Sequence, residues 1–337
     1  MENEGIVFTR PNAAELLPEP LREPRAGEVL VRTAFSTISS GTERANLTGD
    51  PNIDIRSPGT DHFPRRCGYS SSGIVERVGE GVTSVRPGDA VAMSRSLHRR
   101  FNCLPEALLC RLDPGTELRE AALWYIATFP LAAIRKCRLE LGESALVMGQ
   151  GALGMMAVRL LRAAGAVPIV AADPVREKRA QALGIGADHA FDPLSPDFAQ
   201  SVRACTDGGV RVAIEVTGVG RGLDGALDCM APAGRVALLG CTRHSDFSID
   251  YYRKVHGPGI TLIGAHTAAR PGTDSSPGWW TAGDDMRALR RLCGSGRLSL
   301  APLIAETHRP EEAPEVYARL ARGGGFPLVQ FDWRDEG

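Results

Sequence analysis

The sequence predicts an α/β protein in which a doubly wound parallel sheet is joined to a second, β-rich domain. From about residue 144 to 264, short apolar runs alternate with helical segments, which is the pattern of a parallel sheet built from βαβ units. Before about residue 120, the chain shows β-rich runs interrupted by glycine and proline turns, as in the strand–turn–strand stretch 73–94. These two patterns divide the chain into domains of different architecture.

The composition is that of an ordinary globular protein. The 337 residues are enough for two domains, 43% of them are hydrophobic, and the formal net charge is −1. Such a charge provides no electrostatic footprint for nucleic acid or an anionic membrane. No apolar run approaches the ~18 residues of a membrane span, so we expect neither a nucleic-acid nor a membrane partner.

The cysteines and the first residues favour the cytoplasm. None of the eight cysteines forms a CxxC pair, and a disulfide framework is typical of short secreted chains. The start MENEGIVFTR lacks the basic and apolar regions of a secretory signal. We therefore expect reduced thiols and a cytoplasmic location.

The order of the segments places the domain boundaries. A helical stretch at 121–140, with a kink or break expected at Pro130, leads into the first apolar strand, 144–148. The last apolar strand is 259–264, and beyond it the alternation loosens. We predict a parallel-sheet domain at 125–265 and a β-rich domain formed by 1–124 and 266–337.

A glycine-rich turn follows the first apolar strand and predicts a dinucleotide site. The stretch GQGALG, residues 149–154, matches GxGxxG between a strand and a helix that ends at Gly165. Gly149 permits the tight turn, Gly151 lets the backbone approach a pyrophosphate, and Gly154 lets helix and strand pack closely. The helix N-terminus then offers unpaired N–H groups to the phosphates, which is typical of a Rossmann domain.

Asp173 indicates which dinucleotide binds. It lies 19 residues after Gly154, at the end of the next strand, where a carboxylate accepts hydrogen bonds from the ribose hydroxyls and repels a 2′-phosphate. NAD is therefore favoured over NADP, although Arg176 and Lys178 follow closely and an arginine there can hold a 2′-phosphate. The other residues that we assign to the cofactor are Leu153, Thr217, Gly240 and His266.

These features together resemble the medium-chain dehydrogenase/reductase family, the group of zinc alcohol and polyol dehydrogenases. The resemblance covers nearly the whole chain and is carried by the stretches GEVLVRTAFSTISSGTE, GIVERVGEGVTSVRPGDAVA and GQGALGMMAVRLLRAAGA. It implies a GroES-like catalytic domain together with the Rossmann domain, and a homodimer or homotetramer.

The chain departs from the family at the metal ligands. Zinc members carry a G-I-C-G-T-D and a G-H-E segment, whose cysteine, histidine and often glutamate hold the catalytic metal. Ser40 stands at the cysteine, Tyr69 at the histidine and Ser70 at the glutamate, and the E-P-L segment of polyol-type members becomes 129–131, FPL. Hydroxyl groups are poor zinc ligands beside thiolate, imidazole and carboxylate, so we expect no metal.

Two further observations bear on metal. Only Cys103 and Cys110 stand where the structural zinc of the family needs four closely spaced cysteines, so that zinc is also expected to be missing. An unorthodox site stays open as the alternative, and its ligands would be Asp61, His62, Cys67 and His98.

Hydroxyl groups are the candidates to replace the metal. Zinc removes the proton of the alcohol and stabilises the developing alkoxide, and oriented hydroxyl donors can provide an oxyanion-like cradle instead. Thr42 matches the residue that relays the proton in the family, and Tyr69 is the candidate acid/base or electrophilic donor; alternatively, Tyr69 only fills the space that zinc left. Glu43, which matches an aspartate behind the zinc ligands, either orients a neighbour or is an exposed turn carboxylate. Ser40 and His62 complete the candidate catalytic set.

Histidines and tryptophans supply the remaining candidates. His62, His98 and His266 are potential proton acceptors near neutral pH, and structural histidines are the alternative; His98 is also assigned to the substrate site, with the two tryptophans below. Trp279 and Trp280 lie in a polar, glycine-flanked loop, where an indole face can stack on a sugar or cyclitol ring or pack in a dimer contact. The arginine pairs at 65–66 and 99–100 favour an anionic substrate or are solvated faces.

The predicted function is a zinc-independent, NAD-dependent dehydrogenase. It oxidises a secondary alcohol of a polyhydroxylated small molecule, such as a sugar, polyol or cyclitol, or reduces the matching ketone. One alternative is a quinone or enoyl reductase, although such enzymes usually use NADPH and Asp173 argues against it. A second is a dinucleotide-binding sensor or partner protein that lost catalysis with its zinc.

Overall fold

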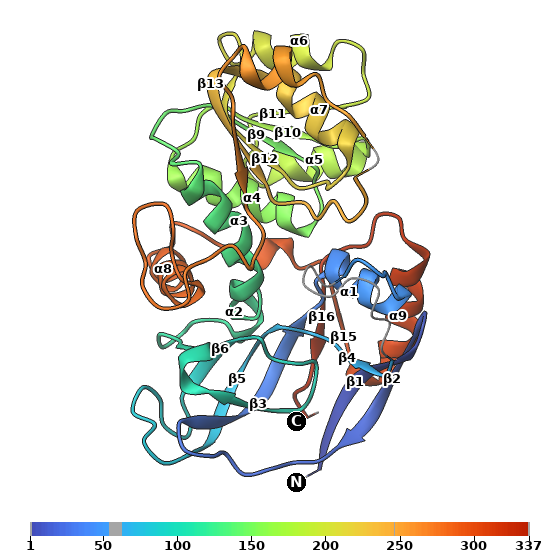
Figure 1. The fold of residues 1–337 in the computed structure, drawn as a ribbon. Helices are drawn as coiled ribbons and strands as arrows, with labels where there is room; N and C mark the ends of the chain where they lie inside the picture. The colour runs from blue at the N-terminus through green and yellow to red at the C-terminus, as the bar shows by residue number, and fades with distance from the viewer. Residues whose placement is uncertain (1, 54–62, 246, 336–337) are drawn as a thin grey trace. The chain divides into compact units, whose positions relative to one another are not determined.

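The chain forms two compact units (Figure 1). A computed structural model describes residues 2–53, 63–245 and 247–335. The first unit comprises residues 1–126 and 286–337, and the second unit comprises residues 127–285. No helix among the described residues is long and apolar enough to cross a membrane.

The second unit is a doubly wound parallel sheet, as the alternating pattern predicted. Its six strands follow the order β11-β10-β9-β12-β13-β14, and every neighbouring pair is parallel. The strand order reverses between β9 and β12, which is the switch point where such sheets bind ligands. The strands are β9 (Ala145–Met148), β10 (Ile169–Ala172), β11 (His189–Phe191), β12 (Val210–Glu215), β13 (Met230–Leu238) and β14 (Thr261–Gly264).

Apolar side chains explain why this sheet forms. All residues of β9 and β10 are buried, because strands of a parallel sheet are covered on both faces. Leu146, Val170 and Ala213 belong to one core cluster with Val202 of α6 and Ala226 of α7. The helical elements are α4 (Ala152–Ala164), α5 (Arg176–Gly184), α6 (Phe198–Ala204), α7 (Gly220–Asp228) and the π-helical turn η2 (Tyr252–His256).

The first unit is β-rich, also as predicted. It contains a three-stranded sheet, β2-β1-β4, and a sheet with the order β15-β16-β3-β5-β6-β8, in which β7 also pairs with β3. The strands are β1 (Asn3–Arg10), β2 (Ala13–Glu19), β3 (Glu28–Thr37), β4 (Arg65–Arg66), β5 (Ser70–Val78), β6 (Ala90–Ser94), β7 (Phe101–Pro105), β8 (Leu109–Arg111), β15 (Glu306–His308) and β16 (Val329–Asp332).

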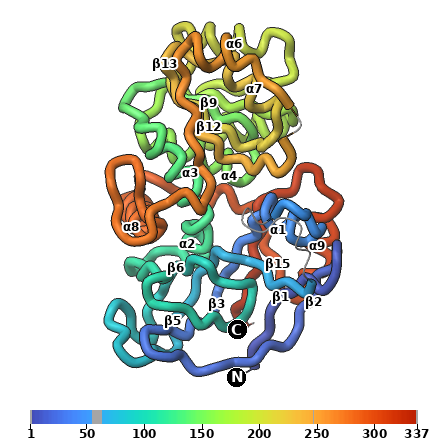
Figure 2. Tube along the Cα trace, in the orientation of Figure 1, coloured from blue at the N-terminus to red at the C-terminus, as the bar shows by residue number. Residues whose placement is uncertain are grey.

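The end of the chain completes the first unit. The chain trace in Figure 2 shows the red C-terminal segment returning to the blue N-terminal one, and β16 pairs with β3. Ile6, Phe8, Tyr317, Phe331 and Trp333 pack in one buried cluster. The helices of this unit are α1 (Ser40–Thr48), α2 (Leu118–Ala121), α9 (Ala313–Arg322) and the short turns η1 (Glu106–Leu108), η3 (Ala301–Leu303) and η4 (Pro310–Glu312). Two further helices, α3 (Trp124–Lys136) and α8 (Ala282–Gly294), include the residues at which the units divide.

Three segments differ from the sequence-based expectation. Residues 40–48, for which no element was assigned, form helix α1, in which Glu43, Ala45 and Leu47 are buried. The alternating pattern predicts one helix over the stretch GLDGALDCMAPAG, residues 222–234, but the helix ends at Asp228, and the proline and glycine beyond it lie in β13. Helix α3 continues through Pro130, because burial of 126–134 outweighs the ~3 kcal/mol that an interior proline costs.

Residues 266–285 also differ from the expected assignment. They cluster with the second unit and not with the β-rich unit. Lys136 donates hydrogen bonds to the backbone oxygens of Gly264 and Ala269, and Arg135 donates to Asp285 at 2.8 Å. These side-chain contacts have no periodic signal in the sequence.

Candidate active site and dinucleotide-binding loop

The glycine-rich loop lies between β9 and α4 and has the geometry of a phosphate-binding turn. Gly149 has φ +99°, which favours glycine, and Gly151 is the N-cap of α4. A Cβ on Gly154 would lie 1.9 Å from the backbone oxygen of Gly149, so only glycine fits there. A Cβ on Gly151 would meet no atom within 4 Å, so the backbone is open on that side. Leu153, which we also assign to the cofactor, lies in the first turn of α4.

Asp173 follows β10 and is tied to the same loop. One carboxylate oxygen accepts the N–H of Gln150 at 2.8 Å, and the other accepts the N–H of Val175 at 2.9 Å. Lys178 Nζ lies 4.0 Å from the carboxylate, whereas Arg176 is exposed at the start of α5. The backbone thus fixes an acidic group next to the phosphate-binding turn.

Sequence reasoning did not single out Arg179. Its guanidinium donates to the backbone oxygens of Asp173 and Pro174 and lies 3.4 Å from Asp192. Arg179 therefore supports the turn that carries Asp173. The sequence indicates this role only through its spacing, because Arg179 stands one helical turn after Val175.

Three more assigned residues lie beyond the carboxyl ends of neighbouring strands. Thr217 follows β12, Gly240 follows β13 and His266 follows β14. Carboxyl ends of parallel strands share one edge of a sheet, so these residues lie at the same edge as the glycine-rich loop. Thr217 hydrogen-bonds to Glu215, and a Cβ on Gly240 would lie 2.2 Å from the backbone nitrogen of Gly218.

His266 is set as a neutral hydrogen-bond donor. Its Nδ1 accepts the backbone N–H of Ala268 at 3.1 Å, so in the neutral ring the proton lies on Nε2. Partial burial lowers the pKa of His266, and the positive charges of Lys136 and Arg243 lower it further. In this form the imidazole can donate from Nε2 but does not accept a proton there.

The first unit brings together three hydroxyl groups at the start of α1. Tyr69 donates a hydrogen bond from its phenol to Ser39 Oγ, and Thr42 is a second hydrogen-bond partner of the same phenol. The Tyr125 ring packs edge-on against the Tyr69 ring, with centroids 5.8 Å apart. We call Ser39, Thr42 and Tyr69 the hydroxyl cluster.

Burial decides the protonation state of Tyr69. It raises the pKa of the phenol well above its usual value, and the negative charge of Glu43 acts in the same direction. The hydrogen bonds between this phenol and the side chains of Ser39 and Thr42 lower the pKa, but burial outweighs them. Tyr69 is therefore a neutral donor around pH 7, and not a phenolate base.

The other residues at the former ligand positions have structural contacts. Ser70 is buried and donates to the backbone oxygen of Ala122 at 2.7 Å, while Ser40 is the first residue of α1. Phe129 is buried in α3. Hydroxyl and phenyl groups of this kind do not fit a catalytic zinc, because zinc prefers thiolate, imidazole and carboxylate.

Glu43 and His98 are buried together, which changes the role of both. The side chains are 2% and 0% exposed, and His98 Nε2 lies 3.1 and 3.2 Å from the two carboxylate oxygens of Glu43. Glu43 is thus no exposed turn carboxylate. His98, which we expected to contact substrate, has no surface for that contact, because strands and helices of the first unit enclose it.

The same pair belongs to a group with metal-ligand chemistry. The ligand atoms of Glu43, Cys67 and His98 lie within 4.8 Å of one another. The Glu43 carboxylate already accepts hydrogen bonds from the Ser39 N–H, the Tyr317 phenol and His98, so its charge is stabilised without an ion. Asp61 and His62, the other candidate ligands, lie outside the described residues.

The two tryptophans are covered on one face by cations of the second unit. The guanidinium of Arg135 lies 3.6 Å from the centre of the Trp280 ring, and Lys136 Nζ lies 4.6 Å from that of Trp279. Trp279 remains 43% exposed. Stacking of a substrate on these rings is therefore confined to their other faces.

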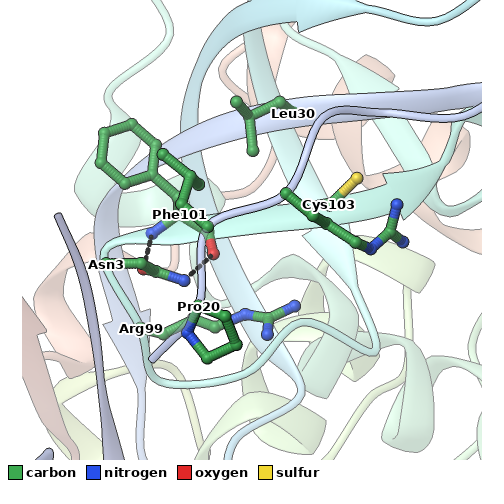
Figure 3. A pocket seen from close by; sticks show the side chains of 8 residues that line it. Asn3, Pro20, Leu30, Arg99, Phe101 and Cys103 are labelled. Atoms are coloured by element: carbon green, nitrogen blue, oxygen red, sulfur yellow. Dashed lines mark hydrogen bonds between the residues drawn. The ribbon is translucent and has the colours of Figure 1, made fainter. Parts of the chain in front are cut away.

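The arginine pairs expected near an anionic substrate are occupied by protein groups. Arg66 and Arg99 pair with Glu19, Arg100 pairs with Glu4, and Arg65 donates to Asn46. Figure 3 shows a pocket of the first unit that Arg99 lines together with Pro20, Phe101 and Cys103. None of the assigned site residues lines this pocket.

Comparisons with known proteins identify the family. The family model described as "Zinc-binding dehydrogenase" matches residues 152–274. An L-threonine 3-dehydrogenase from Pyrococcus abyssi is 32% identical over 97% of this chain and 97% of its own length. The chain belongs to the zinc-binding dehydrogenase family, the medium-chain dehydrogenases. It is an oxidoreductase by that membership.

Other relatives carry names that mention different substrates. A D-guloside 3-dehydrogenase from Escherichia coli (strain K12) is 25% identical and covers 93% of this chain and 94% of its own length. The crystal structure of galactitol-1-phosphate dehydrogenase from Escherichia coli has a TM-score of 0.84, with 21% identity and coverage of 98% and 99%. A putative zinc-binding dehydrogenase from Sinorhizobium meliloti 1021, bound to NADP, has a TM-score of 0.82, with 19% identity and the same coverage. The two solved structures support the fold of this medium-chain dehydrogenase.

Proposed function

We propose that the protein is a zinc-independent, NAD-dependent dehydrogenase that oxidises a secondary alcohol of a sugar, polyol or cyclitol, or reduces the matching ketone. The observation that carries this proposal is the hydroxyl cluster of Ser39, Thr42 and Tyr69, in which Tyr69 stands at the position of a zinc ligand and Thr42 at that of the proton relay. The named relatives act on hydroxyl-bearing small molecules, which supports the substrate class.

Tyr69 is the proposed acid and electrophilic donor. NAD, when bound, would supply the hydride chemistry, and the glycine-rich loop and Asp173 would hold it. When substrate is bound, the neutral phenol of Tyr69 turns its single proton from Ser39 Oγ to the reacting oxygen, with Ser39 then donating to the phenol oxygen, and it stabilises the developing alkoxide as an oxyanion donor does. Ser39 and Thr42 orient that phenol, and in alcohol oxidation the proton that leaves the substrate oxygen passes along these hydroxyls to water, each hydroxyl releasing one proton as it takes one. In ketone reduction the phenol supplies the proton to the oxygen while the carbon receives the hydride.

The choice of NAD rests on Asp173. A carboxylate fixed beside the glycine-rich loop accepts hydrogen bonds from a ribose and repels a 2′-phosphate. We expect NADH to bind at least about tenfold more tightly than NADPH, which corresponds to about 1.4 kcal/mol. Asp173→Ser should reduce the ratio of NADH affinity to NADPH affinity, as measured by quenching of protein fluorescence.

Glu177→Gln is the matched control for this experiment. It removes a neighbouring exposed negative charge in the first turn of α5 and should leave the ratio unchanged. Tighter binding of NADPH than NADH by the unmodified protein would overturn the assignment of NAD.

The purified protein is expected to contain far less than stoichiometric zinc. Hydroxyl groups replace the family's ligands, so chelators should leave its activity unchanged. Elemental analysis after dialysis measures the metal directly. Retained stoichiometric zinc would contradict zinc independence, and its loss in His98→Gln but not in His256→Gln would place it in the group of Glu43, Cys67 and His98.

A further inference from the structure

Behind the hydroxyl cluster lies a fully enclosed group of polar side chains. Each of its members is at most 5% exposed, although they come from β3, α1, α9 and the segments after β4, β6 and β16. Polar groups buried to this extent are costly unless their hydrogen bonds are made. The members are Ser36, Glu43, Cys67, His98, Tyr317 and Trp333.

Glu43 is the centre of the group. One carboxylate oxygen accepts the backbone N–H of Ser39 at 2.8 Å, and the other accepts the phenol of Tyr317. His98 Nε2 lies within hydrogen-bonding distance of both oxygens. The position of Glu43 in the first turn of α1 adds the favourable potential of a helix N-terminus.

The hydrogen bonds also define the form of His98. Ser36 Oγ accepts the indole N–H of Trp333 at 2.8 Å and lies 2.7 Å from His98 Nδ1. A carboxylate only accepts, so the ring proton that faces Glu43 lies on Nε2; in the neutral ring Nδ1 is then an acceptor, to which the Ser36 hydroxyl donates. Every partner of the carboxylate is thus a donor, which holds the carboxylate in a single orientation.

Ser39 links this buried group to the hydroxyl cluster. Its backbone N–H is held by Glu43, and its side-chain oxygen accepts the phenol proton of Tyr69. Resting on the proposed function, we propose that Glu43 is a positioning residue of the dehydrogenase, whose carboxylate fixes Ser39 and thereby aims the Tyr69 hydroxyl. His98 and Ser36 hold the carboxylate from behind, and neither touches substrate.

The test is a double-mutant cycle between Glu43 and Ser39. Ser39→Ala removes only the oxygen that accepts from Tyr69, whereas Glu43→Gln disturbs the group that holds the Ser39 backbone. Each should lower kcat by about tenfold, because small displacements of a positioned group are costly in rate. The double variant should lose no more than the larger single loss, and NADH affinity should not change. Additive losses would overturn the proposal.

A measurement without substrate separates this proposal from the proposed function. The chain has five tyrosines, so incorporated 3-fluorotyrosine gives few ¹⁹F resonances, and Tyr69→Phe identifies that of Tyr69. Ser39→Ala and Glu43→Gln should both shift the Tyr69 resonance. An unmoved resonance in folded Glu43→Gln would overturn the role of Glu43, even if the protein turns over no polyol.

Two further variants guard against a merely structural effect. Tyr317→Phe removes one buried hydroxyl that also donates to Glu43, but it leaves the Ser39 contact in place. It should lower the melting temperature and change kcat and the Tyr69 resonance less than Glu43→Gln does, because the Ser39 contact remains. A loss of kcat as large as that of Glu43→Gln would overturn the route through Ser39. If Glu43→Gln does not fold, Glu43→Asp takes its place, because it keeps the negative charge but moves the carboxylate away from the Ser39 N–H. The same shift of the Tyr69 resonance is then expected.

Discussion

Replacing Tyr69 by phenylalanine is expected to lower kcat by about 10²-fold on a confirmed alcohol substrate, with little change in NADH affinity. The substitution removes only the phenolic oxygen, and losses of this size are usual for an acid/base or oxyanion donor. The effect should fall on kcat because the hydrogen bond strengthens as charge develops on the substrate oxygen. A screen of polyols with NAD⁺ and steady-state kinetics of both proteins measure it.

Tyr125→Phe is the control for that experiment. It keeps the edge-on ring that packs against Tyr69 and removes only a neighbouring hydroxyl, so kcat should stay within about twofold.

Thr42→Val removes the second hydroxyl partner of Tyr69 and should lower kcat, as Tyr69→Phe does. If Tyr69→Phe and Thr42→Val both keep more than half of the kcat, the hydroxyl cluster does not perform the chemistry and His266 is the next residue to replace.

Gly154→Ala is expected to weaken NADH binding by about 10²-fold or more, or about 2.7 kcal/mol. The added Cβ would lie 1.9 Å from the backbone oxygen of Gly149, so the glycine-rich loop itself must move. The loss of packing between α4 and β9 should also lower the melting temperature. Calorimetric titration with NADH and thermal unfolding measure the two effects.

Substitutions at two other glycines distinguish a change in the loop's conformation from a loss of space for the pyrophosphate. Gly151→Ala meets no protein atom within 4 Å, so it should keep the melting temperature but lose NADH affinity, because the Cβ occupies the side open to a pyrophosphate. Gly184→Ala, in α5, also meets no atom and should change neither quantity. Unchanged NADH affinity in both Gly151→Ala and Gly154→Ala would place the dinucleotide elsewhere.

Much of the dinucleotide-binding part was predictable because its residues are close in the chain. The glycine-rich loop and Asp173 belong to one βαβ unit, in which strand, turn and helix follow one another directly. Parallel strands then bring Thr217, Gly240 and His266 to the same edge without further information. Even the reason for Gly154, the close approach to Gly149, follows from the spacing of the motif.

The hydroxyl cluster was predictable only in part. The departure from the family's ligands pointed to Thr42 and Tyr69, but Ser39, which accepts from Tyr69, was passed over in favour of Ser40. The reason is that 40–48 is a short helix whose burial decides its form, so its N-cap could not be located from propensity. The role of the two tryptophans likewise depended on Arg135 and Lys136, more than 140 residues earlier in the chain.

The sequence by itself determined the class of fold, the family and the place of the dinucleotide loop, because these depend on local periodicity and on motifs of a few residues. Only the tertiary structure decided that Glu43 is buried, that His98 faces Glu43 and not solvent, and that Tyr317 completes the group. Glu43 is separated from His98 by 55 residues and from Tyr317 by 274. A carboxylate among these donors exists only when α1, α9 and the segment after β6 pack together, and packing over such separations has no local signature.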